Sequence, residues 1–294
     1  MKIYKLLKRS SIILAVFYIM LSFAGFNESF ALSQKINDAK KKIVLNIEPR
    51  DDKGVNIESN FTNVDYGSTN SDKNNITHNN DIENSIANAQ IKEEVLKQLK
   101  SIIYEDSYRN TVLNKYYIFS FDDAISIIRS LEEKITSVSE AHDIPKSMIA
   151  ATLFREIMFM GQEDLLDGMD IIGGDTIGIS QIGVNNAKRN DLYVHGINSV
   201  IAFQNEDQIR DELKDINHSV YFCAMQLKAR AIQITGKKDV DIQSLDDNKI
   251  KHIFQEYNQS PIKYTIGPIK TKQKYGEETF RYYKLFERYY NITK

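Results

Sequence analysis

The chain has 294 residues, of which 42% are hydrophobic and 27% charged, with a formal net charge of −2. These proportions are ordinary for a globular protein with one good-sized hydrophobic core. The single cysteine, Cys223, excludes an internal disulfide. The mildly acidic balance argues against nucleic-acid binding, which depends on the neutralisation of phosphates.

Residues 1–31 are predicted to be a signal peptide. Four basic residues precede an apolar run over 11–26, and Ser29-Phe30-Ala31 supplies small residues where a signal peptidase cleaves. The apolar run is long for a signal and short for a membrane span, so an uncleaved membrane anchor is the alternative. Cleavage would also remove one acidic residue and change the formal charge from −2 to −5. We therefore expect an exported protein, extracellular or associated with the cell wall.

Residues 32–90 are rich in Asn, Ser and Thr and poor in apolar residues. Such a segment buries too little surface to offset the entropy of ordering, so it is predicted to be a disordered tether. Residues 91–116 are predicted to form a peripheral helical segment, because Val95, Leu99, Ile102 and Ile103 recur at helical spacing. The compact domain is expected over residues 117–294.

The compact domain is predicted to be mainly α-helical. Ser120 followed by Asp123 resembles a capping box and opens a helix that reaches about His142. Pro145 suits the first position of the next helix, which extends to Met160. Short strand candidates occur only at 171–172 and 177–179, so at most a small β hairpin is expected. Further helices are expected over 182–188, 209–235, 247–257 and 277–290.

Glu156 is the first candidate for a chemical role, because it lies on or beside the apolar stripe of the 145–160 helix. A carboxyl group on such a stripe would be partly desolvated, which raises its pKa and keeps it protonated near neutrality. A general acid requires this protonation state. The alternative interpretation places Glu156 at the edge of the stripe, in contact with water. The stripe consists of Met148, Ile149, Thr152, Leu153, Glu156 and Met160 at three- and four-residue spacing.

Two motifs follow Glu156: Gly-Ile-Ser-Gln-Ile at 178–182 and Tyr-Asn-Gln-Ser at 257–260, after a helical run at 250–256. Their order and spacing resemble the soluble lytic transglycosylase family, relatives of goose-type lysozyme with the lysozyme-like fold. That family shows Glu-Ser, Gly-Leu-Met-Gln, a helix with Asn-Ile-x-x-Gly-x-x-Tyr-Leu, and Ala-Tyr-Asn-Ala-Gly. The third element is altered here, at 219–227, and the resemblance covers roughly residues 121–290.

The resemblance implies a role for each matching residue. Glu156 matches the family's catalytic acid, which protonates the glycosidic oxygen between N-acetylmuramic acid and N-acetylglucosamine in peptidoglycan. Gln181 matches a glutamine that lines the substrate cleft, with Ser180 beside it, and Tyr257 and Asn258 match a pair near the carboxyl and the bound sugar. No cofactor or metal is implied. Peptidoglycan glycan strands are the expected partner, cell-envelope assembly proteins are further candidates, and the oligomeric state is left open.

The sequence also departs from the family pattern. Ile157 stands where the family has serine, and Gly178 follows Glu156 by 22 positions, several more than is usual. The added loop is acidic, and Asp175 is the best-placed second carboxylate for a hydrolytic muramidase. Without a second carboxylate the lytic route is favoured, in which the 6-hydroxyl of the muramyl sugar closes on its own anomeric carbon. A non-catalytic wall-binding or assembly module is the third alternative, because Ile157 and the altered 219–227 element weaken the match.

Other kinds of site are not expected. The acidic residues at 163–170 do not have the ligand order of a calcium loop. Cys223 has no evident base in sequence register and is expected to be buried filler. The histidines lack metal-ligand spacing; they are His78, His142, His195, His218 and His252.

Overall fold

The computed structural model describes residues 72–105, 117–161, 176–258 and 269–291. By its internal contacts the chain divides into a unit of residues 1–46 and a unit of residues 47–294. All of the described residues belong to the second unit. The predicted signal peptide, residues 1–31, and the tether up to residue 71 lie outside the described residues.

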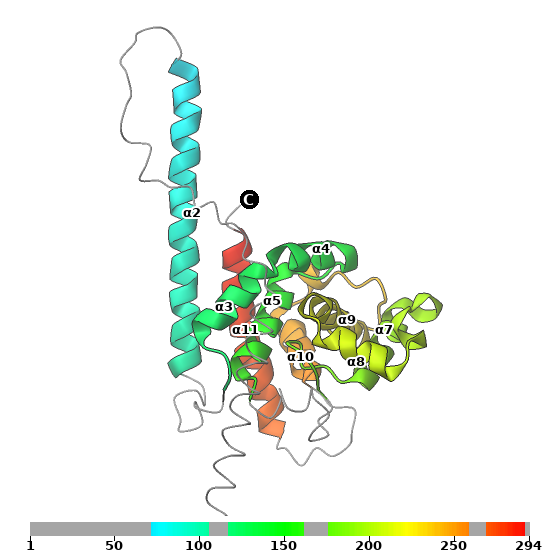
Figure 1. Cartoon of the computed structure of the whole chain (residues 1–294). Coiled ribbons are helices and arrows are strands. Elements are labelled where there is room, and N and C mark those ends of the chain that lie inside the picture. Colours follow the sequence, from blue (N-terminus) through cyan, green and yellow to red (C-terminus); the bar gives the residue numbers. More distant parts are fainter. Residues whose placement is uncertain (1–71, 106–116, 162–175, 259–268, 292–294) are drawn as a thin grey trace, which may run out of the picture. The chain divides into compact units, whose positions relative to one another are not determined.

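Mainly α-helical structure is confirmed for the described residues, which contain no β-strand (Figure 1). Isolated bridges join Tyr117 to Gly161 and Ile177 to Ile182, so the strand candidate at 177–179 is reduced to one bridge, and the candidate at 171–172 is not described. The α-helices are α2 (Asp72–Glu105), α3 (Phe121–Ser130), α4 (Glu132–His142), α5 (Lys146–Phe159), α7 (Val184–His195), α8 (Glu206–Lys214), α9 (Ile216–Thr235), α10 (Asp247–Tyr257) and α11 (Ile269–Tyr290). Short 3-10 helices are η3 (Gly196–Asn198), η4 (Ile201–Phe203) and η5 (Ile242–Ser244).

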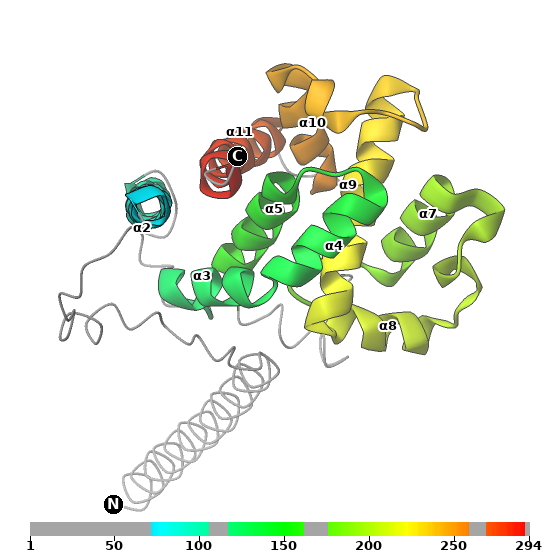
Figure 2. The same cartoon turned by 90° about the horizontal axis from the view of Figure 1, so that it is seen from above.

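Helix α5 lies at the centre of the helical domain. It packs against α3, α4, α9 and α11, and Figure 2 shows it between α11 on one side and α4 and α9 on the other. Every residue of α5 is buried except Lys146, Arg155 and Phe159. A helix that is apolar almost all round is typical of such a central position. Pro145 is the N-cap of α5 and not its first helical residue, which corrects the predicted start by one position.

Two of the predicted helices are each divided into two helices in the structure. The capping box of Ser120 and Asp123 is confirmed by reciprocal side-chain bonds of 3.1 and 2.9 Å to the two backbone N–H groups. The helix that it opens is interrupted at Leu131, between α3 and α4. The predicted helix over 209–235 is two helices, because the carboxylate of Asp215 accepts hydrogen bonds from the N–H groups of Asn217 and His218 and starts α9.

Helix α2 corrects the boundary between the tether and the peripheral helix. It begins at Asp72, so residues 72–90 are helical where the sequence predicted disorder. Val95, Leu99 and Ile103 are fully buried, and Arg288 of α11 donates to Gln98 at 2.9 Å. The packing of this C-terminal half of α2 against α11 gives the helix a support that local composition does not reveal.

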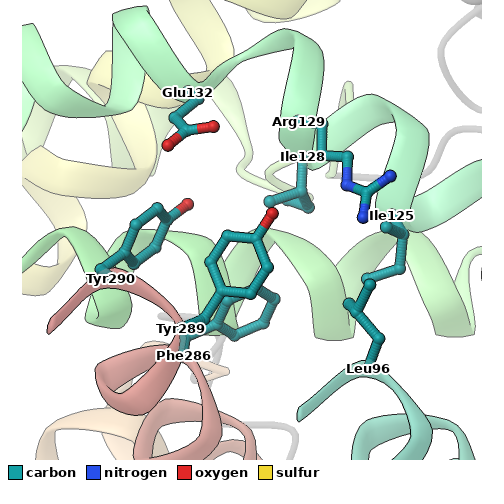
Figure 3. A pocket seen from close by; sticks show the side chains of 8 residues that line it. All are labelled: Leu96, Ile125, Ile128, Arg129, Glu132, Phe286, Tyr289 and Tyr290. Carbon is teal, nitrogen blue, oxygen red and sulfur yellow. The ribbon is translucent and has the colours of Figure 1, made fainter. Parts of the chain in front are cut away.

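A small apolar pocket lies beside the contact of α2 with α3 and α11 (Figure 3). Its volume is about 10 Å³, about the minimum that could hold one water molecule. The pocket is therefore a packing defect and not a ligand site. Its lining residues are Leu96, Ile125, Ile128, Arg129, Glu132, Phe286, Tyr289 and Tyr290.

Within the described ranges, none of the helices combines the length and the apolar character needed to cross a membrane.

Candidate active site

Glu156 lies near the C-terminal end of α5, at the contact with α11. Its exposed fraction is 9%, so the interpretation that placed it in contact with water does not describe this structure. The hydroxyl of Tyr275, in the second turn of α11, donates a hydrogen bond to one carboxyl oxygen of Glu156. Burial and the charge of Glu156 raise the pKa of Tyr275 well above its ordinary value, so this hydroxyl remains a donor.

Arg155 adds a positive charge beside the carboxyl of Glu156. Its guanidinium carbon lies 3.8 Å from the ring centroid of Tyr275. One guanidinium nitrogen is 4.0 Å from Glu156 Oε1, and the other is 3.7 Å from Glu278 Oε2. The carboxyl of Glu156 is therefore buried beside one hydroxyl donor and one guanidinium.

The segment from Thr176 to Ile182 forms a tight turn whose backbone requires glycine at position 178. Gly178 has φ +69°, and a Cβ atom there would lie 1.9 Å from the carbonyl oxygen of Leu213. Gln181 also has a positive φ, 50°. Its side-chain amide accepts from the hydroxyl of Thr176 at 2.9 Å and donates to the carbonyl oxygen of Gly178 at 3.0 Å. The half-buried amide of Gln181 therefore stabilises its own turn.

Tyr257 connects the end of α10 to this turn. Its hydroxyl donates to the carbonyl oxygen of Ser180 at 2.8 Å. Its own carbonyl oxygen accepts from Gln226 at 2.6 Å, and Gln226 accepts from Asn190 at 3.0 Å. Burial, followed by the charges of Cys223 and Glu156, raises the pKa of Tyr257 well above its ordinary value. The end of α10 is thus joined to α9 and, through Gln226, to α7.

The structure gives Glu156 a direct contact with Tyr275, which was not predicted, and Tyr257 a direct contact with the turn of Ser180 and Gln181. The charge of Glu156 is one of the causes that raise the pKa of Tyr257. Asn258 follows directly as the exposed C-cap of α10. Asp175, the candidate second carboxylate, lies outside the described residues.

Ser180, which was predicted to bind substrate, lies inside the structure. Ser180 is fully buried, and its hydroxyl has no hydrogen-bond partner among the described residues. Only its backbone carbonyl enters the site, as the acceptor for Tyr257. The reason is the reversal of the chain after Gly178, which leaves Ser180 on the interior side of the turn.

Cys223 is buried in α9, as expected of a filler residue. Desolvation raises the pKa of its thiol, which argues against a nucleophilic thiolate. No cluster of three or more potential metal ligands occurs within the described ranges.

Sequence reasoning missed Tyr275, Arg155 and Glu278. Arg155 is adjacent to Glu156 and is half-buried in the structure. Its position as a charged residue within an otherwise apolar helix is the feature of the sequence that could have indicated its role. Tyr275 and Glu278 belong to α11, which begins at Ile269 and not at the predicted 277.

No family model matches the sequence, and comparison with curated proteins and with solved structures gave no match either. The case for a particular chemistry therefore depends on the residues and their geometry.

Proposed function

We propose that this protein is an exported lytic transglycosylase, which cleaves the β-1,4 bond between N-acetylmuramic acid and N-acetylglucosamine in peptidoglycan. The observation that carries the proposal is the environment of Glu156. One buried carboxyl, at the end of a central apolar helix, accepts a hydrogen bond from a phenol and lies beside a guanidinium. The lysozyme-like fold and the N-terminal signal peptide are parts of the same proposal.

In this mechanism Glu156 acts first as an acid and then as a base. It gives its proton to the glycosidic oxygen while the bond from that oxygen to the anomeric carbon breaks. The 6-hydroxyl oxygen of the muramyl sugar then bonds to the anomeric carbon, and its proton passes to Glu156. The product is a 1,6-anhydro sugar, no water is consumed, and the carboxyl returns to its starting state.

The neighbouring residues support both steps. Burial favours the protonated carboxyl that the first step needs, and the Tyr275 hydroxyl and the Arg155 guanidinium stabilise the carboxylate that the first step leaves. Tyr257 holds the 177–182 turn in place through the carbonyl of Ser180. In this proposal Gln181 and Asn258 contribute amide groups to the substrate site, because amides suit a substrate rich in hydroxyl and acetamide groups.

A non-catalytic wall-binding module is the second candidate. It is favoured by the finding that the Glu156 carboxyl is nine-tenths buried and already accepts a bond from Tyr275. In that case the carboxyl would be a structural acceptor between α5 and α11. A hydrolytic muramidase would instead need Asp175 or another second carboxylate.

Mass spectrometry of digested peptidoglycan distinguishes these functions. Purified peptidoglycan is incubated with the chain from residue 32 onward, as wild type, as Glu156→Gln and as Glu140→Gln. Glutamine keeps an oxygen that can accept from Tyr275, so Glu156→Gln should fold. Glu140 is an exposed glutamate on α4, and its substitution is the matched control.

We expect anhydro-muropeptides from wild type and Glu140→Gln, and none from Glu156→Gln. Reducing muropeptides from wild type would mean hydrolysis and would direct attention to Asp175. If folded wild type binds peptidoglycan and releases no product, the non-catalytic module is the correct function.

A further inference from the structure

The connection between α7 and α8 carries most of the exposed large apolar side chains of the described residues. We call these side chains, which are 43% to 92% exposed, the apolar edge; they are Leu192 and Tyr193 at the end of α7, Ile197 in η3, Val200, and Phe203 in η4. Elsewhere in the described ranges, the exposed large apolar side chains are Ile86 and Ile91 of α2. Single exposed apolar residues are normal on a protein surface, whereas a group of them indicates an interaction site.

The apolar edge is held in place from the interior of the domain. Both η3 and η4 pack against α7, and Figure 2 shows the connection from α7 to α8 as an outward loop. Ser199, between η3 and η4, is buried; its hydroxyl donates to the buried carboxylate of Asp191 and accepts from the N–H of Ala202 at 3.0 Å. Gln204 donates to Glu212 of α8 at 2.7 Å. A loop that is already fixed loses little conformational entropy when a partner binds.

Two residues of the apolar edge lie on one face of η4. The N–H of Phe203 bonds to the carbonyl oxygen of Val200 at 3.3 Å. Residues three positions apart are eclipsed in a 3-10 helix, so both side chains point to the same side. Ile201, between them, is buried and points inward. The short helix thus separates an anchoring side from a solvent-facing apolar side.

The size of the apolar edge fits a protein partner. Its side chains expose roughly 600 Å², if a fully exposed large apolar residue presents about 200 Å². The largest apolar patch on a typical monomer is about 300–600 Å², so this one is at the upper end. Two such surfaces in contact would bury roughly 1,200 Å², which is the lower limit of a specific protein–protein interface.

Opposite charges border the two ends of the apolar edge. Lys188 and Arg189 precede it on α7, and Glu206 and Asp207 follow it in the first turn of α8. In a two-fold symmetric dimer, if residue i contacts residue j of the other copy, then j also contacts i. Two antiparallel copies would therefore bring Arg189 of each copy toward Glu206 of the other. An anionic lipid surface fits less well, because it would repel Glu206 and Asp207.

We propose that the apolar edge is the interface of a homodimer, in which two copies of this segment pack antiparallel about a two-fold axis. Burial of apolar surface supplies the attraction, and the charges at the rim set the orientation. Because the buried area is at the lower limit for a specific interface, the dissociation constant should be about 1–100 μM. The proposal does not depend on the chemistry of Glu156.

Sedimentation velocity of the chain from residue 32 onward, at about 1–200 μM, measures the dimer. Ile197→Asp places a charge in the interface, and the two-fold axis introduces it twice. Ile86→Asp makes the same change at an exposed isoleucine of α2 and is the matched control. We expect wild type and Ile86→Asp to dimerise alike, and Ile197→Asp to dimerise at least about tenfold more weakly. A wild-type chain that stays monomeric over this range, or a dimer that Ile197→Asp leaves intact, would overturn the proposal.

Charge exchange tests the antiparallel orientation. Arg189→Glu alone places like charges opposite each other, and so does Glu206→Lys alone. Each variant should therefore dimerise severalfold more weakly than wild type. An equimolar mixture of the two should regain wild-type affinity, because each mixed dimer then contains only opposite-charge pairs. If the mixture associates as weakly as the separate variants, the two copies do not meet in this orientation and the proposal fails.

Cosedimentation with vesicles of phosphatidylglycerol and phosphatidylcholine tests the other occupant. If wild type is monomeric and sediments with the vesicles, whereas Ile197→Asp does not, the apolar edge binds lipid and the homodimer is wrong. If wild type forms a dimer that Ile197→Asp weakens and does not sediment with the vesicles, the proposal is supported.

Discussion

Tyr275 donates a hydrogen bond to the carboxyl group of Glu156, and the two residues are 119 positions apart in the chain. The bond joins α5 to α11, the pair of helices with the most extensive mutual packing. Arg155 covers the ring of Tyr275 and also approaches Glu156, so the three side chains form one unit. These side chains therefore contribute to the contact of α11 with α5.

Tyr275→Phe tests the contribution of this bond. The variant removes the hydroxyl donor to a buried carboxyl group, which should cost about 1–3 kcal/mol of unfolding free energy. Urea unfolding measures the loss. Tyr193→Phe, at an exposed position, is the control and should leave the unfolding free energy unchanged.

Gly178→Ala and Gly236→Ala separate backbone strain from close packing. The two glycines have nearly the same φ, +69° and +71°. A Cβ atom at 236 would meet nothing within 4 Å, whereas one at 178 would lie 1.9 Å from the Leu213 carbonyl oxygen and 2.8 Å from Ser219 Oγ. Gly236→Ala should cost about 1 kcal/mol, the strain of the left-handed backbone. Gly178→Ala should cost at least about 3 kcal/mol, since packed backbone must also move.

Chemical denaturation at neutral pH gives both free energies. Equal losses in the two variants would mean that the 177–182 turn does not pack against α8 and α9 in solution.

The sequence predicted the limits of a helix correctly where a capping residue marks its start and its apolar stripe stops at its end. The limits of α10 agree with the prediction, because the Asp246 side chain caps its first turn and the apolar stripe stops at Tyr257. The burial of Glu156 followed in the same way from the stripe of α5. The sequence did not predict the division at Asp215, because apolar residues continue at helical spacing on both sides of it. The capping bonds of Asp215 involve only residues two and three positions further along the chain.

Long-range packing accounts for what the sequence could not predict. Tyr275 reaches Glu156 only through the docking of α11 on α5, and no pattern within α11 specifies that register. The polar first half of α2 was assigned to a tether on its composition, although the helix extends from a packed second half. The burial of the Ser180 hydroxyl depends on the positive φ at Gly178, which the Gly-Ile-Ser-Gln motif alone does not reveal.

Leu99→Ala tests whether α2 is part of the cooperative fold. Leu99 is fully buried, so the truncation should cost about 2–4 kcal/mol if α2 unfolds together with the domain. Ile86→Ala, on the same helix at a position 47% exposed, should cost less than about 0.5 kcal/mol. Thermal and urea unfolding of residues 72–294 measure both. If Leu99→Ala unfolds like wild type, α2 is not packed against α11 in solution.

His142 should make the domain less stable in mild acid. Desolvation lowers its pKa, and the charges of His195 and Lys228 lower it further against the opposite effect of Asp191 and Asp143. The unfolded chain therefore binds a proton at His142 at a higher pH than the folded chain does. Where the unfolded state binds more protons, stability rises with pH, so stability should be lost as the pH falls below about 6.5, the ordinary histidine value.

The ring of His142 lies 5.7 Å from that of His195 on α7 and 5.5 Å from that of Tyr221 on α9, so protonation acts at the junction of three helices. We expect His142→Gln to lose less stability than wild type between pH 7.5 and pH 5. His252→Gln, which alters an exposed histidine of α10, should behave as wild type. Urea midpoints at the two pH values measure the difference. Parallel losses in wild type and His142→Gln would assign the acid sensitivity to other groups, because the burial of His142 and the cations that face it would then contribute nothing.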